Sequence, residues 1–192
     1  MSTRNLVLAA LMIAITAALG MIKLSFPFFN EVPITGQTLG IMLAGALLGA
    51  RLGGISIAAF VALVAVGVPL LSGGRGGPGV FASASGGWIL SWPLAAFVIG
   101  YMVEKSIHSL RTWKVFLFNI VGGIIVIYII GMGYQAALTG VPFFTVAIKS
   151  LLFVPGDLLK SFVAAVIAVR VHQAYPLLQG SLAAQSQQHN VS

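Results

Sequence analysis

The stretch 151–170, LLFVPGDLLKSFVAAVIAVR, places two charged side chains inside an apolar run that is otherwise typical of a membrane helix. Asp157 and Lys160 are three residues apart, and Pro155 fits the first turn of a helix, so both side chains project from one helix face. A charge at the middle of a bilayer costs about 2.5–3.5 kcal/mol on insertion scales. The pair must therefore face protein, water or a ligand, and it indicates a binding site.

The composition of the rest of the chain indicates an integral membrane protein. Of 192 residues, 59% are apolar and only 7% are charged, and the mean hydropathy of +1.06 lies far above that of an ordinary soluble domain. At roughly 20 residues per span, the length suffices for about six helices. We expect an all-α bundle of six transmembrane helices in the lipid bilayer, with one domain at 1–178 and a polar, mobile tail at 179–192.

Apolar runs separated by polar or glycine-containing breaks give the expected spans. The break Arg51-Leu52-Gly53-Gly54 is short, basic and rich in glycine, so it predicts the turn of a helical hairpin on the cytoplasmic side. The six predicted spans are 6–22, 34–50, 53–71, 88–103, 115–137 and 144–171.

The net charge of +7 could be mistaken for a nucleic-acid signature, but the basic residues are scattered between apolar runs and form no patch. We therefore expect no nucleic-acid partner. With six spans and a cytoplasmic N-terminus, Lys23 and Arg75 lie outside and Lys149 lies near the outer end of the last helix. The inner side receives more basic residues, which predicts that both termini are cytoplasmic: Arg4, Arg51, Lys105, Arg111, Lys114 and Arg170.

The segment 72–87, SGGRGGPGVFASASGG, is the most distinctive loop. Its glycines fit G-x-G-x-x-G, but a dinucleotide site needs a strand and a βαβ unit, which an all-helical membrane chain does not supply. A flexible connector is one interpretation of the loop. We favour a backbone that approaches a ligand closely, with Arg75 as its only charged side chain.

On this topology, unusual residues from three outer segments converge on one pocket. Intramembrane ionisable groups are functional by default, which favours a ligand site over a purely structural ion pair. Other interpretations stay open, because Thr35 could cap a helix and Trp88, Trp92 and Tyr134 could be interface anchors. The expected ligand-binding residues are Glu31, Thr35, Gln37, Arg75, Trp88, Tyr134, Asp157 and Lys160.

Such a pocket suits a small molecule that carries both hydrogen-bond donors and an anionic group. Asp157 can accept from N–H groups, Lys160 can donate to a carbonyl or carboxylate, and Arg75 can hold a carboxylate bidentately. In the first span, Ala10, Ala14 and Ala18 form a small-residue stripe. This stripe fits either packing within the bundle or docking of a partner helix.

Three segments of the chain resemble the signature stretches of the BioY family, the biotin-binding S-components of energy-coupling factor (ECF) transporters. They are PITGQT at 33–38, GGRGGPG at 73–79 running to GGW at 86–88, and PGDLLK at 155–160. The resemblance covers residues 1 to about 178. Ala84-Ser85 stands where Pro-Thr is common in the family, and Trp88 stands where Tyr is common.

The resemblance implies an S-component fold in a prokaryotic plasma membrane that captures biotin on the extracytoplasmic side. It also implies docking with a membrane T-component and two cytosolic ATPases, with the alanine stripe facing the T-component. Asp157 would meet the ureido N–H groups of biotin. Lys160 and Arg75 would meet the ureido carbonyl and the carboxylate, in an order that stays open, and Trp88 would pack on the apolar part.

The chain lacks the Walker-A pattern, so hydrolysis of ATP would fall to the partner ATPases. It also lacks cysteine, a metal-binding cluster and a paired catalytic set. We therefore expect no catalytic residue, no metal site and no cofactor, and biotin as the ligand. The alternatives are an S-component for another vitamin, or an ion-coupled secondary transporter of a small anionic metabolite.

Overall fold

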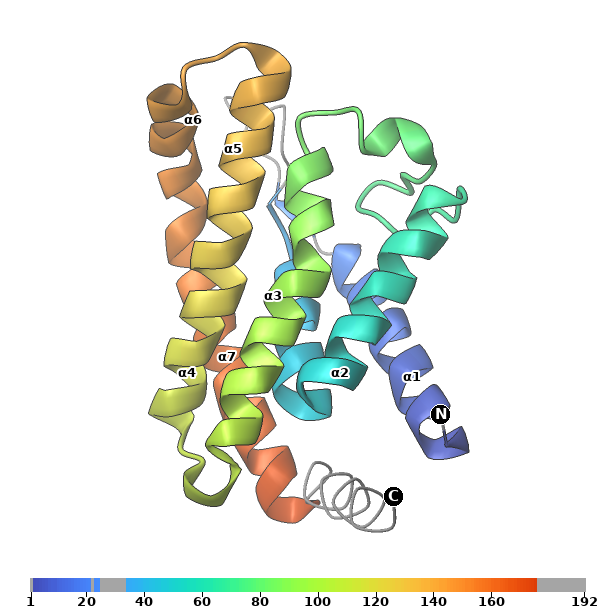
Figure 1. Cartoon of the computed structure of the whole chain (residues 1–192), viewed down its shortest axis with the longest axis vertical. Helices are drawn as coiled ribbons and strands as arrows, with labels where there is room; N and C mark the ends of the chain where they lie inside the picture. Colours follow the sequence, from blue (N-terminus) through green and yellow to red (C-terminus); the bar gives the residue numbers. More distant parts are fainter. Residues whose placement is uncertain (1, 22, 25–33, 176–192) are drawn as a thin grey trace, which may run out of the picture.

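Long helices run side by side along the long axis of the molecule (Figure 1). The computed structural model describes residues 2–21, 23–24 and 34–175, so the predicted tail at 179–192 lies outside the described residues. The main helices are α1 Thr3–Gly20, α2 Gln37–Ala65, α3 Gly86–Lys105, α4 Thr112–Ile120, α5 Ile127–Thr139, α6 Phe143–Ser150 and α7 Val154–Ala174.

Short elements link or extend these helices. Strand β1 Lys23–Leu24 pairs antiparallel with β2 Ile34–Thr35. A π-helix, η3 Val121–Val126, joins α4 to α5 without a break in the helical path, and the 3-10 turn η4 Leu151–Phe153 joins α6 to α7. The remaining 3-10 turns are η1 Pro78–Val80 and η2 Ile107–Ser109.

Five helical stretches of the described chain are long and apolar enough to cross a membrane. Four of them match predicted spans, namely Thr3–Gly20, Gly86–Lys105, Thr112–Thr139 and Phe143–Ala174. The fifth, Gln37–Ala65, contains both of the spans predicted at 34–50 and 53–71. Apart from the two short strands, the regular elements of the described chain are thus helices, and their number and length are those of a protein that crosses the membrane several times.

Helix α2 nevertheless reverses direction within its length, at Gly49. This glycine has φ 79° and ψ −174°, a conformation that other residues rarely adopt. A Cβ atom on Gly53 would lie 2.6 Å from the carbonyl oxygen of Ala44, whereas nine residues of straight helix span about 13.5 Å. The predicted hairpin therefore exists as two arms, 37–48 and 50–65, but its predicted turn at Arg51–Gly54 was wrong because those residues are helical.

The core lies between α2 and α3, and small residues bring the two backbones together. A Cβ atom on Gly45 would lie 2.5 Å from the Ala96 carbonyl oxygen, so only glycine fits at this contact. Phe60 is fully buried against Trp92, with ring centroids 6.0 Å apart. The prediction of Trp92 as an interface anchor was wrong, because this close packing draws its ring into the bundle.

Helix α1 packs on the first arm of α2 through one face. Thr16 lies against Gly40 and Gly20 lies against the Gln37 side chain. The predicted stripe of Ala10, Ala14 and Ala18 lies on another face and is exposed. Its interpretation as packing within the bundle was therefore wrong, since the larger side chains Met12 and Thr16 make that contact.

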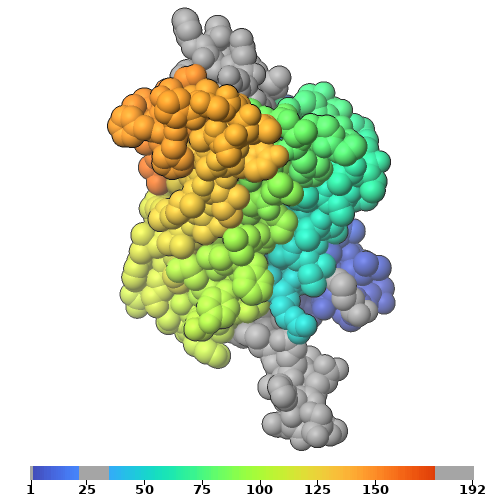
Figure 2. All heavy atoms as spheres, turned by 45° about the horizontal axis from the view of Figure 1, so that its top comes forward, coloured from blue at the N-terminus to red at the C-terminus, as the bar shows by residue number. Residues whose placement is uncertain are grey.

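The two ends of the bundle carry different features (Figure 1). The start of α1, the break in α2, the α3–α4 connection and the end of α7 lie at one end. The glycine-rich loop and the α5–α6 connection lie together at the other end, in green and orange in Figure 2. The fold thus gathers the glycine-rich loop and the approach to α7 at one end, as the sequence predicts.

The close contact at Gly45 gives a test of this packing. Gly45→Ala should lower the free energy of unfolding by about 1–3 kcal/mol, because the new methyl group meets backbone atoms of α3 that cannot move aside. Gly133→Ala is the control, since no atom of the described residues would lie within 4 Å of its Cβ. Thermal unfolding in detergent should show a lower midpoint for Gly45→Ala only. Equal midpoints would contradict the close approach.

Candidate functional site

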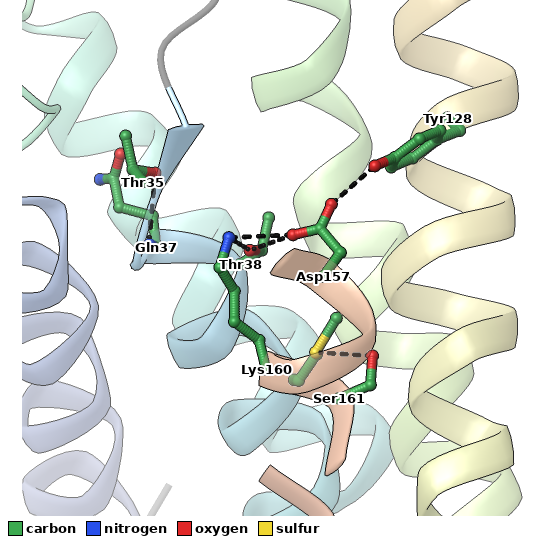
Figure 3. A network of polar contacts seen from close by, with 8 residues as sticks. Thr35, Gln37, Thr38, Tyr128, Asp157, Lys160 and Ser161 are labelled. Atoms are coloured by element: carbon green, nitrogen blue, oxygen red, sulfur yellow. Dashed lines mark hydrogen bonds and ion pairs between the residues drawn. The ribbon is translucent and has the colours of Figure 1, made fainter. Parts of the chain in front are cut away.

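The Asp157 carboxylate is the centre of a buried polar network (Figure 3). Its Oδ1 accepts hydrogen bonds from Lys160 Nζ at 2.9 Å and from Thr38 Oγ1 at 3.1 Å. Its Oδ2 accepts from Tyr128 Oη at 2.7 Å. Asp157 is only 5% exposed, so a cation and two hydroxyl groups from three helices compensate the buried charge.

The local sequence explains why Asp157 and Lys160 meet. Pro155 lies in the first turn of α7, where its missing N–H is not needed. Asp157 also lies in that first turn, where free backbone N–H groups favour a negative charge. Lys160 follows one turn later on the predicted shared face, and its ammonium group forms an ion pair with Asp157 at 2.9 Å.

Lys160 keeps bonding capacity beyond the ion pair. Its Nζ also donates to Thr38 Oγ1 at 3.1 Å, and an ammonium group has three N–H donors. No acceptor for the third N–H is found among the described residues. The Lys160 side chain is 17% exposed, so this donor is available to a ligand.

An aromatic cluster of Trp88, Tyr128 and Phe153 adjoins the carboxylate. The Trp88 ring lies edge-on to Tyr128 at 5.2 Å and to Phe153 at 6.1 Å between ring centroids. Trp88 is 7% exposed, and its Nε1 donates to Gln135 Oε1 at 3.2 Å. Gly131 makes room for the indole ring, which any larger residue would overlap. Trp88 is therefore not an interface anchor but part of an apolar surface beside Asp157.

A second polar layer lies one helical turn further along α7. Asn119 Nδ2 donates to the Ser161 carbonyl oxygen at 2.9 Å, and Ser161 Oγ donates to Met42 Sδ at 3.5 Å. The π-helix η3 separates Asn119 from Tyr128, and both of these side chains bond to α7. The wider turn of a π-helix changes the register along a helix, so η3 sets where Tyr128 points.

Side chains of α2 and α5 donate hydrogen bonds to backbone carbonyl oxygens in and just before the glycine-rich loop, and the Gly77 N–H of the loop donates to the Val64 carbonyl oxygen of α2 at 2.7 Å. Tyr134 Oη donates to the Phe81 carbonyl oxygen at 2.6 Å, and Gln37 Nε2 donates to the Leu70 carbonyl oxygen at 3.2 Å. Within the loop, Arg75 Nε donates to the Ser72 carbonyl oxygen at 3.2 Å. Tyr134, Gln37 and Arg75 thus belong to the loop and its attachments rather than to the Asp157 network.

The other predicted residues have local roles or lie outside the described residues. Thr35 Oγ1 accepts a hydrogen bond from the Gln37 backbone N–H at 3.3 Å, beside the start of α2. This is the capping type of contact that the sequence left open for Thr35. Glu31 lies outside the described residues.

The structure adds two residues that the sequence did not identify as site residues, Thr38 and Tyr128. Thr38 stands in the quoted segment PITGQT, where its position one residue after Gln37 gave no reason to prefer it. Tyr128 places a hydroxyl group in the middle of the apolar run 115–137, and a polar group in such a run needs a partner. That requirement could have pointed to Tyr128.

Known proteins match this chain over most of its length. The family model described as the BioY family matches residues 1–177. The biotin transporter BioY of Rhizobium etli is 44% identical over 183 residues, which cover 93% of this chain and 98% of that protein. The probable biotin transporter BioY of Bacillus subtilis is 41% identical over 168 residues, which cover 88% and 90%.

A solved structure has the same fold. The crystal structure of the S-component for biotin from an ECF-type ABC transporter superposes with a TM-score of 0.84 at 33% sequence identity. The match covers 90% of this chain and 95% of that chain. The S-component fold, the matched family model and the similar transporters agree with one another, and the chain therefore belongs to the BioY family.

Proposed function

We propose that this chain is the biotin-binding S-component of an ECF-type vitamin importer, and is not itself an enzyme. The observation that carries the proposal is the buried Asp157 carboxylate paired with the partly buried Lys160. One Lys160 N–H has no acceptor among the described residues, and an aromatic cluster lies beside the pair. Biotin offers two ureido N–H donors, a ureido carbonyl, an apolar bicyclic ring and a carboxylate. These groups complement the Asp157 carboxylate as acceptor, Lys160 as donor, the aromatic cluster as an apolar surface and Arg75 as a second cation.

Asp157 is the proposed acceptor for the ureido N–H groups. In the unliganded arrangement its oxygens accept from Thr38, Lys160 and Tyr128, and ligand N–H groups can replace the two hydroxyl donors without leaving the charge unpaired. Trp88 and Tyr128 would pack against the ring system. Lys160 and Arg75 would bind the ureido carbonyl and the biotin carboxylate, in an order that stays open. Ligand contacts by the other predicted residues stay predictions: Glu31, Thr35, Gln37 and Tyr134.

The orientation we propose places the glycine-rich loop outside the cell. The opposite end carries the basic residues Arg4, Arg51, Lys105, Arg111, Lys114 and Arg170, which favours the cytoplasmic side of a prokaryotic plasma membrane. On this proposal each arm of α2 is a separate span, giving six spans with both termini inside. Residues 1–178 then form one membrane domain, followed by the polar segment 179–192.

The proposed partners follow from the same function. Import against a gradient needs an energy source, and a T-component with two cytosolic ATPases would supply it. The stripe of Ala10, Ala14 and Ala18 is exposed on α1, and small residues permit a second helix to approach closely. We propose this stripe as the contact with the T-component.

Asp157→Asn tests the ligand site. The substitution removes the negative charge and should weaken biotin binding about 10- to 100-fold, because a hydrogen bond to a charged group contributes about 1.5–3 kcal/mol. Isothermal titration calorimetry of the purified protein measures this change. Lys149→Gln is the control, since Lys149 is exposed and lies on α6, away from the network.

Three outcomes would contradict the proposal. Affinity of Asp157→Asn within twofold of the parent, about 0.4 kcal/mol, would make Asp157 structural. Absence of biotin binding by the parent in the micromolar range, together with binding of thiamin or riboflavin, would favour an S-component for another vitamin. Uptake by this chain alone that follows an ion gradient would favour a secondary transporter.

Comparing two related ligands shows which of Lys160 and Arg75 binds the biotin carboxylate. Biotinamide keeps the ureido ring but replaces the carboxylate by a neutral amide. The residue that binds the carboxylate should, when changed to glutamine, weaken binding of biotin about tenfold more than binding of biotinamide, because only biotin loses a charge pair. Calorimetry of Arg75→Gln and Lys160→Gln with both ligands measures the difference. Equal losses for both ligands in both variants would contradict a carboxylate contact by either residue.

A further inference from the structure

The reversal of α2 at Gly49 separates two backbone groups that an uninterrupted helix would join. In a regular α-helix the Ala50 N–H would donate to the Ala46 carbonyl oxygen. Both residues are almost fully buried, with Ala46 0% and Ala50 3% exposed. A buried backbone group without a partner is costly, and more so inside a membrane, where water does not replace the lost bond.

Side chains from two other helices bond these groups. The Ala50 N–H donates to Glu104 Oε1 of α3 at 2.9 Å. His172 Nε2 of α7 lies 2.8 Å from the Ala46 carbonyl oxygen. Because a carbonyl oxygen only accepts, the imidazole N–H is the donor of that bond.

The electrostatics of the break favour this arrangement. Ala50 begins the second arm of α2, where the helix dipole favours a carboxylate, and Ala46 lies in the last turn of the first arm, where it favours a donor such as imidazole. Gly100 of α3 lies against the backbone of Gly49 and Ala50, and a Cβ atom there would overlap them. The close approach of α3 brings Glu104, one turn further on, within reach of Ala50.

We propose that Glu104 and His172 are positioning residues that form a clamp at Gly49 and fix α2, α3 and α7 relative to one another. Each helix that the clamp joins carries a residue of the Asp157 site toward its other end. Helix α2 carries Thr38, α3 carries Trp88 and α7 carries Asp157. The second arm of α2 also leads directly into the glycine-rich loop.

The clamp therefore sets the angle between the arms at one end, while Gln37 and Leu70 close the opposite end. Loss of the clamp should let the second arm swing away from the first arm and from α1. The effect on ligand affinity rests on the proposed function, but the effect on the angle does not. The two effects can be measured separately.

The angle can be measured without any ligand, because the chain has no cysteine. Cysteines at Met21 and Val66, which are 85% and 79% exposed, carry spin labels at the ends of α1 and of the second arm. Double electron–electron resonance in detergent gives the distance distribution between them. Glu104→Ala and His172→Ala should each broaden this distribution.

Conservative variants separate a clamp from general destabilisation. Glu104→Gln keeps an oxygen acceptor and His172→Gln keeps an N–H donor, so both should restore the narrow distribution. Lys105→Ala and Gln173→Ala, at exposed neighbouring positions, are the controls. If Glu104→Ala does not give folded protein, His172→Ala decides, since it removes one side-chain hydrogen bond at a partly buried position.

A distribution as narrow in both alanine variants as in the parent would overturn the clamp, whether or not the protein binds biotin. A broadened distribution, rescued by the glutamine variants, supports it. Calorimetry with biotin then tests positioning, and we expect affinity about five- to tenfold weaker in the alanine variants. Affinity within twofold of the parent despite a broadened distribution would overturn the positioning role.

Discussion

A carboxylate buried among apolar helices is stable only when its charge and its lone pairs are satisfied, and this requirement at Asp157 governs the bundle. Lys160 comes from the same helix, but Thr38 and Tyr128 come from α2 and α5. All three helices must therefore converge at the start of α7. On the proposed function, the same requirement makes the site responsive, since a ligand that brings its own N–H donors would replace the hydroxyl groups.

The features that the sequence predicted correctly depend on local chemistry. Apolar runs of sufficient length predicted the membrane helices, and the spacing of Asp157 and Lys160 predicted that both lie on one helix face, where they form an ion pair. Glycines near Arg51 predicted a reversal of the chain, and the sharp break between the two arms of α2 uses a positive φ that glycine adopts readily. Its exact place at Gly49 depends on α3, because only Gly100 permits the approach that stabilises the break.

The features that the sequence did not predict depend on packing between distant segments. Trp88 is a typical interface residue by type, yet Gly131 opens a buried position for its ring. The alanine stripe of α1 fitted either packing within the bundle or docking of a partner helix, and the position of α2 leaves the stripe exposed, which excludes the first. Tyr128 became a site residue because η3 alters the register of the helix that carries it.

The attachments of the glycine-rich loop have a consequence for how this family can diversify. Gln37 and Tyr134 bond to the carbonyl oxygens of Leu70 and Phe81, and every amino acid provides such an oxygen. Side chains of the loop can therefore change while these two bonds stay available, except at constrained glycines such as Gly76 and Gly86, where a Cβ atom would overlap a backbone carbonyl oxygen. On the proposed function, ligand selectivity can then evolve through the side chains of the loop while the loop keeps its attachment to the bundle.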